Sequence, residues 1–114
     1  MRILYLCMNK KEQHISNLIK DKIHQKNTDA EVVLFGSHAR GEAREDSDWD
    51  VLILLNTLKV DRKTEKEYRE ELFEIEIEIG EPISTFVFSK NDWETKYRIT
   101  PLYENIHREG IILQ

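Results

Sequence analysis

The chain has 114 residues, of which 39% are hydrophobic and 34% are charged, and its net charge at pH 7 is −5. This length suits one domain with one modest core, and the composition is that of a folded protein with a solvated surface rather than of a disordered chain. The negative charge argues against tight binding to long nucleic acid, which needs a basic face, but not against a nucleotide that arrives with a divalent cation.

The N-terminal segment and the cysteine content bear on location. Cys7 is the single cysteine, which excludes an intramolecular disulfide and a cysteine-rich zinc site. The apolar run at 3–8 is too short for a membrane span or a signal peptide, so we expect a cytoplasmic protein with no membrane partner. Residues 1–8 are interpreted as an N-terminal extension of a domain over 9–114, either a short strand or an apolar first turn, with Met8 as an alternative natural start.

Hydrophobic periodicity and turn residues predict the secondary structure. Apolar residues at helical spacing favour long helices at 10–26 and 61–79, although the Glu-Ile alternation at 74–79 also fits a strand. Residues 49–55, the most apolar run, are typical of a central strand covered on both faces. In chain order, the predicted elements are a helix over 10–26, a strand over 31–35, a short helix over 38–43, a strand over 49–55, a helix over 61–79, a strand over 82–88, a helix from near Lys90, a helix from Pro101 that Gly110 ends, and a short strand over 111–113. This order predicts an α/β (α+β) fold with a small mixed sheet and flanking helices.

Two aspartates stand at the beginning of the predicted central strand. Asp48 and Asp50 are two residues apart, so both side chains leave the same face, with Cα atoms about 6.5 Å apart. Two such carboxylates can converge on one or two Mg²⁺ ions, which prefer oxygen ligands and leave positions for waters and phosphates. Asp46 shares their parity but precedes the strand and is a weaker candidate. An isolated Asp-x-Asp usually marks a solvated strand entry, but here it adjoins a core strand, where functional groups gather.

Gly36 and Ser37 follow the preceding predicted strand and open a short helix. Glycine lets the backbone approach a phosphate closely, and the serine hydroxyl and the free amides of a helix start can hydrogen-bond phosphate oxygens. On its own, a strand-Gly-Ser-helix segment is more often a plain turn. Together with the aspartate pair that begins eleven residues after Ser37, it predicts a phosphate cradle that faces a metal pair on a neighbouring strand.

The residues between these two motifs complete the candidate nucleotide-binding set. Arg40 and Arg44 are interpreted either as phosphate contacts or as ion-pair partners of the aspartates, with structural pairing favoured for Arg40. Ser47 is expected to cap the turn and hold Asp48 in place. His38 lies inside the same segment and is a candidate to touch the nucleotide.

The segment Gly36-Ser37-x-Ala39-Arg40-Gly41, followed by five residues and by Ser47-Asp48-x-Asp50, resembles the signature of the polymerase-beta-like nucleotidyltransferase superfamily. It looks closest to the short stand-alone members, the minimal nucleotidyltransferase (MNT) domains. The chain length, the order of elements and the Pro-Leu-Tyr-x-Asn-Ile-x-x-Glu-Gly ending at 101–110 are also similar to those of MNT domains. The resemblance covers most of the chain after residue 8. It implies the nucleotidyltransferase fold and transfer of a nucleotide, usually AMP from ATP, to a hydroxyl acceptor with Mg²⁺.

The resemblance also implies roles for individual residues. The implied triphosphate-binding residues are Gly36 and Ser37, and the implied metal ligands are Asp48 and Asp50. A third family carboxylate normally comes from a later strand and helps to activate the acceptor hydroxyl. The predicted strand 82–88 has no acidic residue, and Ser84 or Thr85 occupies the expected position. Glu81 is the best substitute, although an exposed loop carboxylate explains this residue equally well.

Two functions are compatible with these residues. The first is a Mg²⁺-dependent enzyme that moves AMP from ATP to a hydroxyl group, as an antitoxin that modifies a HEPN-type toxin; small MNT proteins that this chain resembles often do so. The second is a non-catalytic partner subunit of the same fold that neutralises by binding, which the missing third carboxylate favours. We favour the enzyme, because the aspartate pair and Gly36-Ser37 are intact. Both functions are compatible with a homo-oligomer.

Overall fold

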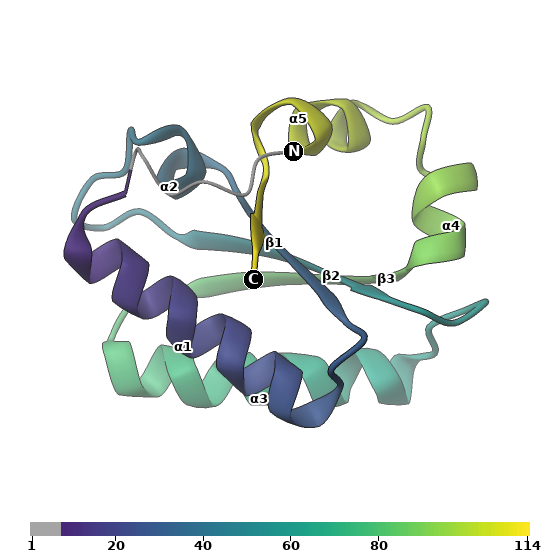
Figure 1. The fold of residues 1–114 in the computed structure, drawn as a ribbon, viewed down its shortest axis with the longest axis horizontal. Coiled ribbons are helices and arrows are strands. Elements are labelled where there is room, and N and C mark those ends of the chain that lie inside the picture. The colour runs from purple at the N-terminus through teal and green to yellow at the C-terminus, as the bar shows by residue number, and fades with distance from the viewer. Residues whose placement is uncertain (1–7) are drawn as a thin grey trace.

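A computed structural model of the protein describes residues 8–114, in which helices alternate with short strands (Figure 1). In chain order the elements are α1 (Lys10–Lys26), β1 (Glu31–Phe35), α2 (Ser37–Arg40), β2 (Trp49–Leu55), α3 (Arg62–Ile79), β3 (Ile83–Ser89), α4 (Lys90–Thr95), α5 (Pro101–Glu109) and β4 (Ile111–Leu113). The predicted order of helices and strands is therefore confirmed.

The four strands form one mixed sheet with the order β3-β2-β1-β4. β2 pairs in parallel with β3, whereas β1 pairs antiparallel with both β2 and β4. The expected small mixed sheet is thus confirmed, with the most apolar strand, β2, at an interior position.

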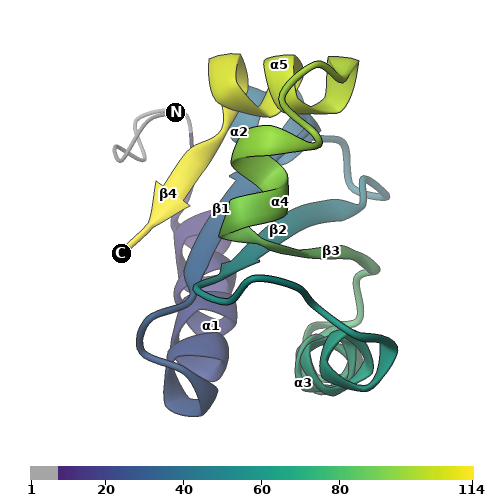
Figure 2. The ribbon, with the colours of Figure 1, turned by 90° about the vertical axis from the view of Figure 1, so that its right-hand side faces the viewer.

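Helices cover both faces of the sheet (Figures 1 and 2). The side chains of β2 alternate between two core layers. Val51 and Ile53 pack in the core beneath α1 and α3. Leu52 and Leu54 point the other way and pack with residues of α4 and α5. Burial on both faces explains why β2 reads as a continuous apolar run rather than as an alternating one. Asp50 lies two residues before Leu52 in the same strand, so its side chain points to the same face, the one that α4 and α5 cover.

Polar side chains fix where the helices begin. Asn9 accepts a hydrogen bond from the Glu12 amide at 2.8 Å, and the Glu12 carboxylate accepts one from the Asn9 amide at 3.1 Å, which forms a capping box at the start of α1. Ser89 and Thr100 cap α4 and α5, as their positions before those helices predict. These caps satisfy amides that would otherwise lack partners at each helix start.

The bounds of one predicted helix differ from the structure, whereas the favoured helical interpretation of residues 74–79 is confirmed. The short helix predicted over 38–43 is α2, Ser37–Arg40, because Gly41 adopts a left-handed conformation with φ of +74° and donates its amide to the Ser37 carbonyl. The alternation at 74–79 belongs to α3 and not to a strand. Ile75 is buried and Ile77 is 67% exposed, so the isoleucines of the Glu-Ile repeat lie on different sides of the helix instead of on one face of a strand.

The beginning of the described chain is buried. Met8 is 6% exposed and belongs to the core under α1, where its sulfur lies 3.5 Å from the Ser16 hydroxyl. The interpretations of residues 1–7 fall outside the described residues. From residue 8 onward, no helix combines the length and the apolar character that a membrane crossing requires.

Candidate functional site

The end of β1 meets the beginning of β2 at the predicted site. Phe35, the last residue of β1, lies opposite Asp50 in the antiparallel pair, and Gly36 follows directly. Gly36 has φ of +78° and ψ of −159°, a backbone conformation open essentially only to glycine. A Cβ atom at this position would clash with Oδ2 of Asp50. The absence of a side chain therefore lets the Gly36 backbone lie directly against a candidate metal ligand.

Asp48 and Asp50 form a pair of carboxylates with different exposure. Asp48 is exposed and Asp50 is half-buried. Burial, and then the negative charge of Asp48, raises the pKa of Asp50, while interactions with His38 and Arg40 act in the opposite direction. A divalent cation between two such carboxylates would relieve both the burial cost and the repulsion.

The surroundings of the aspartates fit a cation that also binds phosphate. Within residues 8–114, no group of three or more His, Cys, Asp or Glu side chains is placed to hold a metal ion. Asp48 and Asp50 alone would leave most positions of an octahedral Mg²⁺ to water and phosphate oxygens, which is how proteins usually hold this ion with a nucleotide. Asp46 is exposed.

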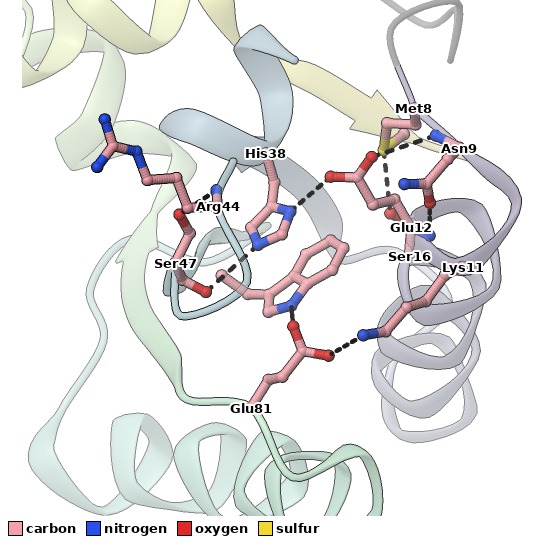
Figure 3. Close-up of polar contacts among 10 residues, drawn as sticks. Met8, Asn9, Lys11, Glu12, Ser16, His38, Arg44, Ser47 and Glu81 are labelled. Carbon is pink, nitrogen blue, oxygen red and sulfur yellow. Dashed lines mark hydrogen bonds and ion pairs between the residues drawn. The ribbon is translucent and has the colours of Figure 1, made fainter. Parts of the chain in front are cut away.

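A closed turn leads into the aspartate pair. The Ser47 hydroxyl accepts a hydrogen bond from the Arg44 amide at 2.8 Å, and the Ser47 amide donates to the Arg44 carbonyl at 3.1 Å. Ser47 therefore caps the turn before Asp48, as its position predicts. The Arg44 side chain is exposed, and its guanidinium group points away from His38 and Glu81 (Figure 3).

Arg40 links the end of α2 to the end of α5. Its Nη1 lies 3.2 Å from both carboxylate oxygens of Glu109, and its Nε donates to Glu42 at 3.1 Å. Arg40 thus makes structural ion pairs, but its partners are two glutamates and not the aspartates that the favoured interpretation named.

A buried aromatic pair, His38 and Trp49, lies beside α1, where His38 meets Glu12 (Figure 3). The His38 ring stacks on the Trp49 indole, with centroids 3.7 Å apart and planes 9° apart. Its Nδ1 lies 2.7 Å from a Glu12 carboxylate oxygen, and its Nε2 lies 3.4 Å from the Ser47 carbonyl. His38 is only 4% exposed, so the expectation that it touches the nucleotide is wrong. Its ring instead joins α1 to the segment that carries Asp48.

Comparison with known proteins agrees with this geometry. Residues 16–112 match the model of the nucleotidyltransferase domain family. The chain belongs to this family. The match covers the Gly36 loop, the aspartate pair, the strands β1 to β3 and the first two residues of β4, and the enzyme class predicted from the motif is confirmed.

One relative of this nucleotidyltransferase domain is an archaeal protein. A Methanocaldococcus jannaschii protein that is provisionally named as a protein adenylyltransferase is 40% identical over 55 residues, which are 48% of this chain and 50% of that protein. The chain thus matches about half the length of this curated relative.

Two solved structures share the fold. One chain of a toxin–antitoxin structure with AMP-PNP superposes with a TM-score of 0.63 and 16% identity, over 87% of this chain and 72% of that chain. One chain of a complex between a tri-AMPylated Shewanella oneidensis HEPN toxin and an MNT antitoxin gives a TM-score of 0.60 and 15% identity, over 90% and 71%.

Glu81, the candidate third carboxylate of this nucleotidyltransferase domain, lies on the α1 side of the sheet. One of its oxygens accepts a hydrogen bond from the Trp49 indole at 3.4 Å, and the other lies 3.2 Å from Nζ of Lys11 (Figure 3). Because Trp49 and Asp50 are adjacent in a strand, their side chains point to opposite faces. The structure therefore does not bring Glu81 to the aspartate pair. The β3 residue in register with Asp50 is Ser84, which carries no charge.

Glu109 at the end of α5 is a carboxylate that the sequence pattern did not single out. Its side chain is 16% exposed, and its negative charge contributes to the raised pKa of Asp50. Unlike Glu81, it belongs to a helix that packs on the Asp50 face of the sheet. The segment 101–110, which resembles the ending of MNT domains, contains this residue, and its Glu-Gly pair is the sequence signal that could have identified Glu109.

Proposed function

We propose that this nucleotidyltransferase domain transfers AMP from ATP, with Mg²⁺, to a hydroxyl group of a partner protein, and that the partner is a HEPN-type toxin which the domain neutralises as an antitoxin. The observation that carries the proposal is the contact between the Gly36 backbone and the Asp50 carboxylate, which sets the candidate phosphate-binding loop against a candidate metal ligand. The adenylyltransferase name of the archaeal relative supports AMP as the transferred group. The structural neighbours in toxin–antitoxin complexes support the kind of partner.

Two pairs of residues would carry separate parts of the reaction, namely metal binding and triphosphate binding. Asp48 and Asp50 would hold the metal, and Gly36 with Ser37 would hold triphosphate oxygens. Mg²⁺, when bound, supplies positive charge that offsets the triphosphate and the two carboxylates. In the transfer, the acceptor oxygen forms a bond to the α-phosphorus, the bond from this phosphorus to the bridging oxygen breaks, and pyrophosphate leaves with that oxygen. The hydroxyl proton passes to a base, and in-line positioning of the two oxygens is the task of the site.

Metal-coupled nucleotide binding is the sharpest test of this proposal. Calorimetric titration with ATP should show binding with Mg²⁺ and little binding in EDTA, because a triphosphate and two carboxylates repel each other without a cation. Asp48→Asn and Asp50→Asn should each weaken this coupling. Asp46→Asn is the matched control, since Asp46 is exposed and lies two residues before the pair. Equal affinity for ATP with Mg²⁺ and in EDTA would contradict the proposal.

A non-catalytic neutralising subunit is the second candidate function. The lack of an acidic residue in β3 favours it. Incubation of the domain with α-labelled ATP, Mg²⁺ and a purified HEPN-type toxin separates the two functions. Label transferred to that protein supports the enzyme, whereas a stable complex without label supports the binding subunit.

A further inference from the structure

Ser84 of β3 occupies the position beside Asp50 on the neighbouring strand. β2 and β3 run parallel, and their register pairs Asp50 with Ser84 and Leu52 with Phe86. Leu52 and Phe86 both belong to the core layer under α4 and α5, so the even-numbered residues of the two strands point to this face. The partly exposed Ser84 side chain therefore lies on the same face as the Asp50 carboxylate, at a strand separation of about 4.8 Å.

A hydroxyl at residue 84 leaves this face with few negatively charged ligands for a cation. Asp48 and Asp50 stand at the beginning of β2, whereas β3 has no acidic residue over Ile83–Ser89. In the chain from Met8 onward, His, Cys, Asp and Glu side chains do not gather in any group of three that could hold a metal ion. The protein ligands that the described residues offer here are therefore those of two aspartates.

The other carboxylates near this end of the sheet already have partners. Glu81 lies on the opposite face and accepts the Trp49 indole. Glu109, whose side chain is 16% exposed, approaches Nη1 of Arg40 with both oxygens at 3.2 Å, and Glu42 pairs with Nε of the same residue. To take part in binding a second cation, Glu109 would have to give up this charge-assisted contact.

A site for two metal ions places different demands on its two sides. One ion of such a site faces the leaving group and the other faces the attacking oxygen, about 3.5–4 Å away. The first ion also receives triphosphate oxygens, whereas the second depends on protein carboxylates, which in addition offset the repulsion between the cations. Asp48 and Asp50 would have to serve both ions at once, because β3 contributes no carboxylate.

We propose that Ser84 sets the metal content of the site, so that the domain binds one divalent cation together with the triphosphate, where a carboxylate at residue 84 would allow two. The inference rests on the proposed function, since it assumes that Asp48 and Asp50 bind the metal, and it narrows that function to a single-ion site. The uncharged hydroxyl also spares the half-buried Asp50 a third negative charge on its face.

Counting bound Mn²⁺ tests the proposal directly. The full chain, with an equimolar amount of α,β-methylene-ATP, which cannot release pyrophosphate, is titrated with Mn²⁺, and the free ion is followed by electron paramagnetic resonance. Wild type should bind one Mn²⁺ per chain tightly. Any second ion should bind about tenfold more weakly or worse, at least the effect of losing a group that supports metal ligands.

Two substitutions at residue 84 make the count specific. Ser84→Asp should raise the number of tightly bound Mn²⁺ ions from one to two, because the new carboxylate lies beside Asp50. Ser84→Asn is the matched control, since asparagine has nearly the size of aspartate but no charge, and it should leave the count at one. If Ser84→Asp does not fold, the wild-type count still decides between one ion and two.

A double-mutant cycle tests the position of residue 84 without metal or nucleotide. In EDTA, Ser84→Asp should unfold at a lower urea concentration than Ser84→Asn, because its carboxylate repels that of Asp50. In an Asp50→Asn background the difference between these two variants should shrink, which is the sign of direct coupling. Added Mn²⁺ should stabilise Ser84→Asp more than Ser84→Asn.

The outcomes separate this inference from the proposed function. Two equally tight ions in wild type would overturn the inference and leave the proposed function intact. A single ion in folded Ser84→Asp, or an equal urea difference with and without the Asp50 carboxylate, would overturn the role of Ser84. No bound Mn²⁺ in wild type would contradict the proposed function itself, and the inference with it.

Discussion

Gly36 and Asp50 approach each other so closely that no side chain fits between the backbone of one and the carboxylate of the other. The contact joins the loop that follows β1 to the first residues of β2, through the pairing of Phe35 with Asp50. Sequence position alone separates these two residues by a turn and a short helix. Their contact is what turns two weak motifs into one candidate site.

Gly36→Ala should therefore affect both folding and metal binding. The new Cβ clashes with Asp50, and the backbone conformation is unfavourable for alanine, so we expect a loss of about 2–4 kcal/mol in the free energy of unfolding. Mn²⁺ affinity should fall as Asp50 is displaced. Gly80→Ala is the control, because Gly80 also has a positive φ, +72°, but no neighbouring atom lies within 4 Å of the place that a new methyl group would take. Urea unfolding and Mn²⁺ titration of both variants check this, and equal losses in the two variants would argue against the clash.

The stability of the protein should depend on pH through Asp50. Because burial and Asp48 raise the pKa of Asp50, the folded state holds this proton to a higher pH than the unfolded state does. The wild type should therefore lose stability relative to Asp50→Asn as pH rises from about 4 through the raised pKa, and the difference should then stay constant. Urea unfolding at a series of pH values without divalent metal measures it.

Asp61 provides a contrast of opposite sign. Its carboxylate accepts the Thr64 amide at the start of α3, which lowers its pKa. The wild type should lose stability relative to Asp61→Asn as pH falls from about 4 through the lowered pKa. If both variants followed the same pH trend, local electrostatics would not be the cause.

His38 should act as a positioning residue for the metal site. Its ring contacts Glu12, Ser47 and Trp49, so removing it should loosen the segment that carries Asp48. We expect His38→Ala to weaken Mn²⁺ binding about tenfold or more, the usual effect of losing a group that holds metal ligands in place. His24→Ala is the control, since His24 also bonds a backbone carbonyl, that of Ala30, at 3.0 Å. Equal metal affinity in His38→Ala and wild type would limit His38 to a role in packing.

The two candidate glutamates should differ in their effect on AMP transfer. Glu81→Gln keeps an oxygen for the Trp49 indole and lies away from the aspartates, so transfer should stay within about threefold of wild type. Glu109→Gln weakens the ion pair with Arg40 on the face of the sheet that carries Asp50. It should therefore lower the rate of AMP transfer more than Glu81→Gln does. Rates of pyrophosphate release with the partner protein compare the two. A loss of about 10²–10⁴-fold in Glu81→Gln would instead identify Glu81 as the base.

Local sequence signals predicted most of the fold and the central part of the site. The apolar run of β2 and the closed turn at Ser47 depend on neighbouring residues, which is why they could be recognised. The contact of His38 with Glu12 joins residues 26 positions apart. The tie of Arg40 to Glu109 spans 69 positions. Only the assembled sheet decides which of its faces each side chain occupies, so the position of Glu81 on the side opposite Asp50 could be suspected from strand parity but not established.

The alternation of side chains at the beginning of β2 also governs which length changes the chain can tolerate. The Trp49 side chain fills the core beneath α1, whereas the side chain of its neighbour Asp50 points to the opposite face of the sheet. A shift of β2 by one residue would therefore turn a carboxylate into the core and an indole toward the candidate site. An insertion between Ser47 and Trp49 should therefore abolish the site and the core together. Residues 44–46, which are exposed, are where added residues could be absorbed without shifting β2. Natural variation in the length of this domain should accordingly concentrate before Ser47 and stop there.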